Sequence, residues 1–292
     1  MTQANTRILF IINPGSGKNN TDWASIIADY FKVTQHIVKL YELTKDCNIE
    51  TIKQEIKLFR PHQAVAVGGD GTIKLVSECV MNTSIKLGII PAGSANGLAS
   101  ELKINTDNAL DIISKGFSQK IHLTNINEQL CIHLSDIGLN AYAMKRFKYQ
   151  KVRGMWGYFI ASMKVLMQNP KMEISMKIDK KAVKMKAEMI VIANATQYGT
   201  GAVINPIGRL DDELFEVIVI KKISLQEVFK MVFTHKEYDL TKTEVFQASS
   251  LAMHSARKVH FQIDGEYLGK IKSLNVEIIP KALELVVPET FI

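Results

Sequence analysis

The chain has 292 residues, 47% of them apolar, so it is long enough for two domains and can bury a sizeable core in each. The formal net charge of +7 favours anionic partners such as nucleotides, nucleic acid or acidic lipid, without selecting one of them. Three widely spaced cysteines, Cys47, Cys79 and Cys131, exclude a disulfide framework and a zinc site, and they fit free thiols in a reducing cytosol.

No secretory or membrane-spanning segment is predicted. Residues Met1–Thr6 are polar, and the apolar run Ile8–Ile12 is too short for the core of a signal peptide. No stretch reaches the roughly 18 consecutive apolar residues that a spanning helix needs. We therefore expect a cytoplasmic protein, whose contact with the inner membrane surface would be peripheral.

Strand and helix patterns alternate over the first hundred or so residues. Short apolar runs predict four strands, Ile8–Ile12, Gln35–Tyr41, Ala64–Val67 and Leu87–Ile90. Other segments predict four helices, Asp22–Phe31, Cys47–Phe59, Thr72–Val80 and Leu98–Leu102. This alternation indicates an α/β domain with a parallel sheet covered on both faces. Such sheets bind ligands at the carboxyl ends of their strands.

The loop Gly68–Thr72 carries the strongest functional signal. Its sequence, Gly-Gly-Asp-Gly-Thr, directly follows the predicted buried strand Ala64–Val67. Successive N–H groups and the start of the following helix form an anion-binding nest that suits phosphate. Asp70 would repel a bare phosphate, so a bridging Mg²⁺ is expected. The alternative is an ordinary βα turn in which Asp70 caps a helix.

Two further loops, Asn13–Lys18 and Pro91–Gly97, fall at the same predicted edge of the sheet. The first is not a P-loop, because it lacks one required Gly and the final Ser or Thr, but it still offers N–H groups, a hydroxyl and a cation. In the second, Ser94 can bind a phosphate oxygen, and the Asn96 amide can donate to a nucleotide or orient a metal-bound water. Helix capping is the alternative for either residue. The convergence of three loops favours a binding site over three unrelated turns.

After about Phe117 the pattern changes to short strands, several of which alternate apolar and polar residues. The predicted strands are Ile121–Leu123, Leu130–Leu134, Met172–Ile178, Ala187–Asn194, Leu214–Lys221, Thr243–Ala248, Lys258–Ile263 and Val276–Ile279. The segments Met155–Gln168 and Leu225–Thr234 are predicted to be helical. We therefore predict a second, mostly antiparallel domain that forms a β-sandwich.

The three loops, in this order and spacing, resemble those of the diacylglycerol kinase catalytic-domain family, which includes bacterial lipid kinases, diacylglycerol kinases, sphingosine kinases and ceramide kinases. Asp264–Glu266 is similar to the family's Asp-Gly-Glu motif, and Asn205–Leu214 resembles its metal loop. The resemblance implies a nucleotide-binding domain related to NAD kinase and phosphofructokinase, followed by a β-sandwich that bears the lipid site. It assigns residues 1–118 and the returning segment 282–292 to the first domain, and residues 119–281 to the second.

The sequence departs from the family pattern at several positions. Gly97 replaces an Asp that is common in bacterial members, so this loop looks closer to the sphingosine-kinase form. Asn140 replaces another common Asp, and Glu213 replaces the Gly of the metal loop. The segment Asn194–Gly201 contains fewer glycines than the glycine-rich run usual in the family. Phosphoryl transfer remains the expected chemistry, and the identity of the substrate stays open.

By this resemblance and by the chemistry of phosphoryl transfer, we expect an ATP-dependent kinase that uses Mg²⁺ and phosphorylates a diacylglycerol-like or other long-chain lipid alcohol. The expected nucleotide-binding residues are Asn13, Ser16, Gly17, Lys18, Gly68, Gly69, Gly71, Thr72, Ser94 and Asn96. Asp70 would act through the catalytic Mg²⁺ or its bound water.

Glu266 is the candidate general base that takes the proton of the lipid hydroxyl group. Asp70 is its rival for this role. Because Asp-Gly is a frequent turn dipeptide, the alternative for Asp264–Glu266 is a hairpin turn. A turn is compatible with a catalytic Glu266.

The resemblance also implies a structural metal ion in the second domain. Asp212 would bind it together with the backbone carbonyls of Arg209 and Leu214. The alternative is a pair of adjacent aspartates that are merely solvated.

The segment Met144–Met167 bears on access to a lipid substrate. Its basic residues precede a group of large apolar ones, Met155, Trp156, Tyr158 and Phe159. Such a combination brings soluble enzymes to anionic membranes, and each cation near the surface contributes roughly 1 kcal/mol. In the alternative interpretation, Trp156 and Phe159 pack in a core behind a solvated basic face.

Two other functions stay open. An NAD kinase-like enzyme shares the Gly68–Thr72 loop, although the Asn13–Lys18 loop and the Asp-Gly-Glu motif speak against it. A non-catalytic nucleotide- or lipid-binding regulator of the same fold is the other, against which intact Asp70 and Glu266 argue. No nucleic-acid partner is expected, because the basic residues are dispersed and no recognition motif is present. A homodimer is compatible with the sequence.

Overall fold

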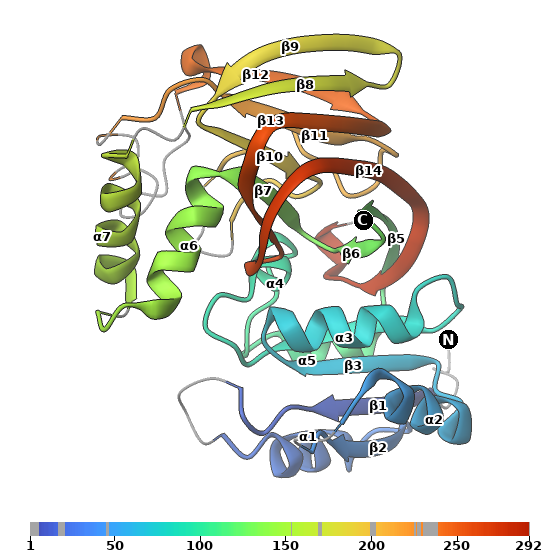
Figure 1. Cartoon of the computed structure of the whole chain (residues 1–292). Coiled ribbons are helices and arrows are strands. Elements are labelled where there is room, and N and C mark those ends of the chain that lie inside the picture. Colours follow the sequence, from blue (N-terminus) through green and yellow to red (C-terminus); the bar gives the residue numbers. More distant parts are fainter. Residues whose placement is uncertain are drawn as a thin grey trace. The chain divides into compact units, whose positions relative to one another are not determined.

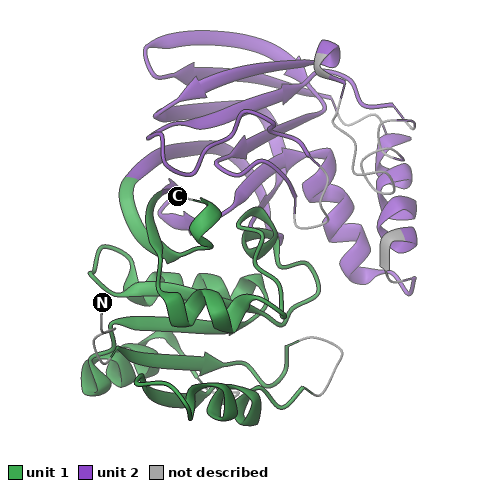
Figure 2. Cartoon of the chain, turned by 180° about the vertical axis from the view of Figure 1, so that it is seen from behind, with its two compact units in different colours: residues 1–121, 280–292 green, residues 122–279 purple. Residues whose placement is uncertain are grey.

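The structure is a computed structural model of the whole chain. It describes residues 6–16, 21–44, 47–152, 154–168, 171–198, 203–224, 226, 229 and 239–291. Gly17 and Lys18 of the first loop lie outside these residues, as does most of the predicted helix Leu225–Thr234. The chain forms two compact units (Figure 2), residues 1–121 with 280–292 and residues 122–279, here called unit 1 and unit 2.

Unit 1 is built on a parallel sheet (Figure 1). Its strands are β1 (Arg7–Ile12), β2 (Ile37–Glu42), β3 (Gln63–Gly68) and β4 (Lys86–Pro91). They lie in the order β4-β3-β1-β2, and every neighbouring pair is parallel. All six residues of β3 are buried, as expected for a strand covered on both faces. The four predicted strands are therefore confirmed, with small shifts at their ends.

The helices of unit 1 follow the strands. They are α1 (Trp23–Phe31), α2 (Ile49–Phe59), α3 (Asp70–Val80), α4 (Gly97–Glu101) and α5 (Ala109–Lys115), and the 3-10 turn η2 (Glu289–Phe291) lies near the C-terminus. Helix α2 packs against α3. Helices α1 and α5 are also linked, because the Tyr30 hydroxyl of α1 donates a hydrogen bond to Asp111 of α5. Four helices were predicted correctly. The seven-residue α5 was not predicted.

Unit 2 is a mostly antiparallel β structure to which helices also contribute. Its strands are β5 (Ser118–Ile126), β6 (Gln129–Cys131), β7 (Leu134–Gly138), β8 (Met172–Ile178), β9 (Lys181–Ala187), β10 (Met189–Ala193), β11 (Phe215–Ile220), β12 (Thr243–Ala248), β13 (Ser250–Ile263) and β14 (Glu266–Val286). Its helices are α6 (Leu139–Tyr149) and α7 (Gly154–Leu166), with a 3-10 turn η1 (Leu240–Lys242). The first residues of β5 and the last of β14 belong to unit 1, where Leu285 of β14 pairs in parallel with Leu87 of β4.

The sandwich of unit 2 arises because the long strand β13 pairs with different strands along its length. Residues Leu251–Ser255 pair with β8, whereas Phe261–Ile263 pair with β7. The strand pair β8-β9 therefore forms one layer, and β7-β10-β11-β12 forms the other. Apolar side chains from both layers share one core, which confirms the predicted β-sandwich.

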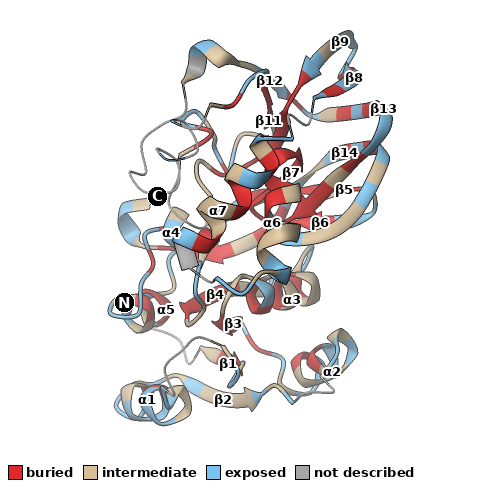
Figure 3. Cartoon of the chain, turned by 60° about the vertical axis from the view of Figure 1, so that its left-hand side comes forward, coloured by how far each residue is buried: buried red, intermediate tan, exposed pale blue. Residues whose placement is uncertain are grey.

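Burial in unit 2 follows the strand period. In β8 buried and exposed residues alternate, so only one face meets the core, and the same pattern colours β8 in Figure 3. All five residues of β10 are buried: Ile190 and Ile192 face the sandwich core, while Met189 and Val191 join a second core with α6 and α7. Helices thus cover the outer face of this layer.

Several predictions for unit 2 are wrong in detail. The predicted strand Leu130–Leu134 is the end of β6 and the start of β7, separated by a loop. The segment Lys181–Ala187 is a strand that was not predicted, because lysines fill its solvent-facing positions and weaken its apolar signal. The helix α6 was also missed. The three cysteines are free thiols, as predicted.

None of the described helices combines the length and the apolar composition that crossing a bilayer requires.

Candidate active site

Three loops of unit 1 meet at the carboxyl ends of neighbouring strands β1, β3 and β4. Their backbones are tied together, because the Asn13 N–H donates to the Val67 carbonyl at 2.9 Å and the Ala92 N–H donates to the Gly68 carbonyl at 2.9 Å. Parallel strands make this convergence unavoidable, since all their carboxyl ends share one edge. The structure therefore brings together the three loops that the sequence singled out.

Asn13 shapes the first loop and joins it to the second. Its side-chain Nδ2 donates to the Thr72 hydroxyl oxygen at 3.0 Å, and its Oδ1 accepts the Gly15 N–H at 3.1 Å. The Ser16 hydroxyl donates to the Asn13 carbonyl at 2.8 Å. These bonds tie the described part of the first loop together and join it to Thr72 of the second.

The glycines of the second and third loops have two different roles. Gly69 and Gly93 let the two backbones touch, because a Cβ on Gly93 would lie 2.4 Å from the Cα of Gly69. At Gly68 a side chain is also excluded sterically, since a Cβ there would lie 2.3 Å from the Thr72 hydroxyl oxygen. At Gly71 a Cβ would meet nothing within 4 Å. The missing side chain at Gly71 leaves room beside the loop.

A depression of about 340 Å³ occupies that room. It is lined by Asn13, Ser16, Leu43, Gly69, Gly71, Thr72, Leu75 and Gly93. Five of these, all but Leu43, Leu75 and Gly93, were predicted as nucleotide-binding residues. Gly93 and the two leucines were not, and the close approach of Gly93 to Gly69 is visible only in three dimensions.

Asp70 is the first residue of α3, and the N-cap is Gly69, so the expectation that Asp70 caps its own helix is wrong. Its carboxylate instead faces the backbone N–H groups at the start of α4, those of Asn96, Gly97 and Leu98. Burial raises the pKa of Asp70, and these N–H groups partly oppose that rise. A partly buried negative charge therefore stands between the second and third loops.

The third loop uses its polar residues differently from the prediction. Asn96 turns its side chain back onto Gly93, accepting the Gly93 N–H and donating to the Gly93 carbonyl, both at 2.9 Å. Its side chain makes no capping bond to α4, although it stands at the N-cap position. Ser94 is exposed and does not line the depression. Asn96 therefore orders the loop through its own backbone.

In unit 2, Glu266 follows a two-residue hairpin turn. Ile263 pairs with Glu266, and the two residues between them, Asp264 and Gly265, have φ of 48° and 84°. Two positive φ values are the mark of the tight turn that Asp-Gly favours, so the predicted hairpin is confirmed. Glu266 is exposed at the start of β14.

Asp264 fastens this hairpin to the β6–β7 connection. Its carboxylate accepts the N–H groups of Ile132 at 3.1 Å and His133 at 2.9 Å. In return, the Asp264 N–H donates to the Leu134 carbonyl at 2.9 Å. The position of Glu266 within unit 2 therefore depends on bonds to residues more than a hundred positions earlier.

Behind the hairpin lies a buried polar cluster centred on Asp136 of β7. Its Oδ2 accepts bonds from Gln262 Nε2 at 2.6 Å, from the Tyr198 hydroxyl at 3.4 Å and from Asn140 Nδ2. Gln262 Oε1 accepts the Gly265 N–H at 2.8 Å, so the cluster reaches the turn. Burial raises the pKa of Asp136 to about 6. The sequence analysis missed this cluster, although an Asp inside the apolar run Leu134–Gly138 is a usable signal.

The cluster explains one departure from the family pattern. Asn140 lies against the Asp136 carboxylate and donates to it, and the Tyr158 hydroxyl donates to Asn140 Oδ1. An Asp at position 140 would set a second carboxylate beside the first in a buried site, where like charges repel strongly. The neutral amide thus fits this position.

The loop Asn205–Leu214 holds the predicted metal residues. Asp212 Oδ1 accepts the Leu214 N–H at 3.2 Å, while Arg209 makes an ion pair with Asp211 at 3.0 Å. Glu213, which replaces a family glycine, has the left-handed φ of 58° that glycine adopts easily. Within the described residues no group of three or more His, Cys, Asp or Glu side chains could hold a metal ion.

The basic and aromatic segment forms α6, α7 and the turn between them. Trp156 is 62% exposed, so the prediction that it packs in a core is wrong, whereas Phe159 is partly buried against the core under α7, as predicted. Tyr149 and Val152 are also exposed near the turn. Apolar and basic side chains therefore share this surface.

Comparison with known proteins identifies both units. The family model of the diacylglycerol kinase catalytic domain matches residues 7–126, and that of the YegS C-terminal NAD kinase beta sandwich-like domain matches residues 135–287. A diacylglycerol kinase of Staphylococcus saprophyticus is 25% identical over 216 residues, or 71% of each chain.

Two solved structures show the same fold. The crystal structure of a diacylglycerol kinase from Bacillus anthracis has a TM-score of 0.74 and 16% identity, and the match covers 100% of both chains. An NAD kinase from Archaeoglobus fulgidus in complex with ATP has a TM-score of 0.57 and 12% identity over 97% of this chain and 94% of that one. The predicted fold class is thereby confirmed.

Proposed function

The chain belongs to the diacylglycerol kinase catalytic-domain family and is a kinase, and we propose that it transfers the γ-phosphoryl group of ATP to the hydroxyl group of a diacylglycerol-like or other long-chain lipid alcohol. The observation that carries this proposal is the convergence of three family-type loops on one depression beside Gly71. The family assignment speaks for catalysis and against the non-catalytic alternative.

The loops of unit 1 suit the phosphates of a nucleotide. Glycine N–H groups, the Thr72 hydroxyl and the start of α3 are the groups that bind phosphate oxygens in such loops. The Ser16 hydroxyl would join them by exchanging its bond to the Asn13 carbonyl for one to a phosphate oxygen. We assign Asn13 and Asn96 to ordering the loops, because their side chains bond to loop backbone and to Thr72. Gly17, Lys18 and Ser94 keep their proposed contact with the nucleotide.

Asp70 fits a role beside Mg²⁺. Its carboxylate is partly buried and faces the N–H groups of Asn96, Gly97 and Leu98 and its own N–H group, so a hydrated Mg²⁺ would interact with it through bound water. Mg²⁺ bound with the nucleotide supplies neutralisation of the phosphate charge. Asp70 contributes a fixed negative charge that attracts the hydrated cation.

We assign the role of general base to Glu266. The side chain is exposed, and its hairpin is held by Asp264 and by the Gln262–Gly265 bond, so the carboxylate can be oriented toward a substrate hydroxyl. The pKa of an alcohol lies far above that of a carboxylate, so this base helps only as the bond to phosphorus develops. Alignment therefore matters more than basicity.

The loop around Asp212 is proposed to hold a structural Mg²⁺. Its donors would be oxygens, namely the Asp212 carboxylate and the backbone carbonyls of Arg209 and Leu214, which is the donor type that Mg²⁺ prefers. Nearby, Asn205 Oδ1 is buried without a hydrogen-bond partner in the described part of the chain. Burial raises the pKa of Glu216, and Asp212 adds to the rise, so a cation here would relieve repulsion.

Contact with an anionic membrane is proposed for the α6–α7 turn. Trp156, Tyr149 and Val152 expose apolar surface there, and Lys148 and Lys151 are exposed on the same turn. Replacing Trp156 by Ala should weaken sedimentation with phosphatidylglycerol vesicles about tenfold, because apolar area inserted in the interface is lost. The control is Leu58→Ala, an apolar residue of unit 1 that is also largely exposed. Equal binding of both variants would refute this contact.

A transfer assay tests the function. Labelled ATP is incubated with diacylglycerol, monoacylglycerol, phosphatidylglycerol, sphingosine, ceramide or NAD, and the products are separated by thin-layer chromatography. The proposal predicts a labelled lipid. The NAD kinase of the same fold makes NAD the second candidate, and labelling of NAD with no labelled lipid would overturn the proposal.

A further inference from the structure

A second depression lies in unit 2, where the two layers of the sandwich separate along β13. It has a volume of about 390 Å³. Between the stretch that pairs with β8 and the stretch that pairs with β7, the described residues 256–260 of β13 pair with neither strand. The register of β13 against β14 also shifts between His254 and Val259. The fold therefore opens a cavity at the point where the sheet splits.

The charged side chains around this cavity are mostly cationic. Lys171, Lys186, Arg257 and Lys258 line it, against a single carboxylate among the described lining residues, that of Glu173. The cavity is more cationic than the whole chain, which has 36 Lys and Arg against 29 Asp and Glu. Grouped like charges repel one another unless an anion lies between them.

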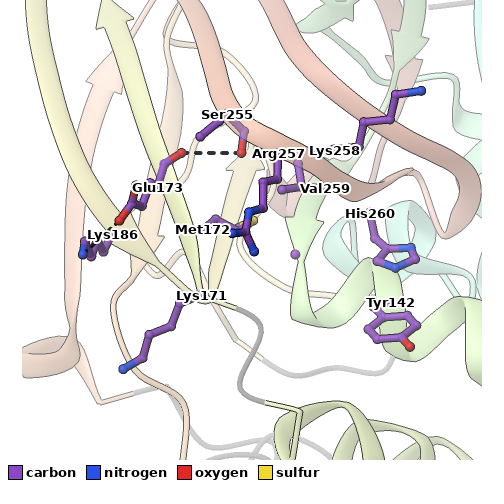
Figure 4. A pocket seen from close by; sticks show the side chains of 12 residues that line it. Tyr142, Lys171, Met172, Glu173, Lys186, Ser255, Arg257, Lys258, Val259 and His260 are labelled. Atoms are coloured by element: carbon purple, nitrogen blue, oxygen red, sulfur yellow. Dashed lines mark hydrogen bonds and ion pairs between the residues drawn. The ribbon is translucent and has the colours of Figure 1, made fainter.

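The one carboxylate is already paired. Glu173 and Lys186 approach to 2.9 Å across the β8-β9 pair, and this bond lowers the pKa of Glu173. Figure 4 shows that pair at one side, with the Arg257 guanidinium beside Met172 in the middle of the cavity and Lys171 on the nearby strand end. Lys258 points away from them. Arg257, whose charge also helps to lower the pKa of Glu173, and Lys171 are the cations placed to meet a ligand.

The opposite wall is flat and aromatic. The rings of Tyr142 and His260 are stacked with centroids 4.1 Å apart and planes 3° apart. Burial lowers the pKa of His260 to about 4, and Lys270 and Lys145 contribute to the shift. His260 is therefore neutral at pH 7, and its neighbourhood is electropositive without it.

We propose that this cavity binds a phosphate ester, either the headgroup of an anionic phospholipid or a soluble organic phosphate. The planar guanidinium of Arg257 can bond two phosphate oxygens at once, and Lys171 adds a second charge. The Tyr142–His260 stack and Met172 give the organic part of the ester an apolar wall. The site is separate from the loops of unit 1, and it requires no phosphoryl transfer.

Binding measurements on two double variants test this site. Lys171→Gln with Arg257→Gln removes the two central cations from exposed positions, where the fold tolerates the change. Lys177→Gln with Lys184→Gln removes the same charge from β8 and β9 outside the cavity. Glycerol 3-phosphate is titrated by calorimetry, and vesicles of phosphatidylglycerol or phosphatidylcholine are sedimented with each protein.

The site predicts that Kd for the bound anion rises about tenfold or more in the first variant and less than about twofold in the second. Loss of glycerol 3-phosphate binding identifies a soluble ligand, and loss of phosphatidylglycerol binding alone identifies a lipid headgroup. Equal losses in the two variants, or no saturable binding of either probe to the unmodified protein, would overturn the proposal. Phosphate binding by the loops of unit 1 would persist in both variants, so it cannot imitate the expected difference.

Discussion

Unit 1 forms its candidate nucleotide site from the backbone of loops that directly follow strands, whereas unit 2 holds Glu266 on a hairpin fixed by side chains distant in sequence. In unit 1, Gly69 and Gly93 bring two backbones into contact, and Gly71 leaves room for a ligand. In unit 2, Asp264 bonds to Ile132 and His133. A site formed by loop backbones corresponds to short sequence motifs. A site formed by side chains depends on contacts between residues that are distant in sequence.

Substitutions in the loops of unit 1 and in the hairpin of unit 2 should therefore have different effects on binding, stability and turnover. Loop changes in unit 1 that meet no neighbouring atom, such as those at Gly71, should affect nucleotide binding more than stability. Substitutions of Gly68 or Gly93 should also lower stability, because an added Cβ would clash with Thr72 or with the Gly69 backbone. Changes at the hairpin of unit 2 should affect stability and turnover together.

The largest effect is expected for Asp264→Ala. The variant leaves the N–H groups of Ile132 and His133 without their acceptor, which should lower the free energy of unfolding by about 2–4 kcal/mol. Turnover should also fall, because the hairpin that carries Glu266 loses its attachment. Chemical denaturation and kinase assays measure both quantities.

Asp264→Asn is the matched control for that variant. Asn tolerates the positive φ of position 264 but keeps only one acceptor oxygen, whereas Ile132 and His133 donate to different oxygens of Asp264. One N–H group therefore loses its acceptor, and the expected cost is about 1–2 kcal/mol, between those of the unmodified protein and Asp264→Ala. If the two variants were equally stable, the attachment of the hairpin by Asp264 would be wrong.

The buried cluster should make stability depend on pH through Asp136. Its pKa in the folded protein is about 6, above the ordinary 3.8, so its stabilising contribution is complete below about pH 4 and is lost as the pH rises through 6. His133 and His260, with pKa values of about 4, act in the opposite direction over the same range. The difference between the unmodified protein and Asp136→Asn therefore isolates the carboxyl group.

We expect Asp136→Asn to gain stability relative to the unmodified protein between pH 4 and 7, by on the order of 3 kcal/mol. Urea denaturation at several pH values measures this difference. A difference that is constant with pH would show that the carboxyl titrates normally in the folded state.

Gly71→Ala should give the smallest change in stability and a clear change in binding. A methyl group there meets no atom within 4 Å, and Ala favours a helix by up to about 1 kcal/mol over Gly, so α3 should be slightly stabilised. The same methyl group enters the depression, and ATP should bind about tenfold more weakly. Unchanged ATP affinity in calorimetry would mean that the nucleotide does not approach Gly71.

The features of unit 1 were easier to predict from the sequence than those of unit 2. The parallel sheet and its loops were predicted because each loop follows an apolar strand and carries glycines. The roles of Gly93 and Asn96 within the third loop escaped prediction, since they depend on contacts between loops and on a side chain folding back on its own backbone.

In unit 2 the sequence predicted the sandwich and the Asp264–Gly265 turn, because both have local patterns. It did not predict the Asp136 cluster or the splitting of the sheet along β13. Asp136 and Gln262 are 126 residues apart and meet only through the pairing of β7 with β13. The cavity lined by Arg257 and Lys171 has no sequence motif, because its residues lie in or next to five elements, β7, α6, β8, β9 and β13.

Glu266→Gln tests the proposed division of labour most directly, when ATP binding is measured together with phosphorylation of the lipid that the transfer assay identifies. If unit 1 binds the nucleotide and Glu266 of unit 2 accepts the proton, ATP affinity should be unchanged and kcat should fall by about 10²–10⁴-fold. Near-normal turnover in this variant would contradict the assignment, and Asp70 would then be the remaining candidate for the base.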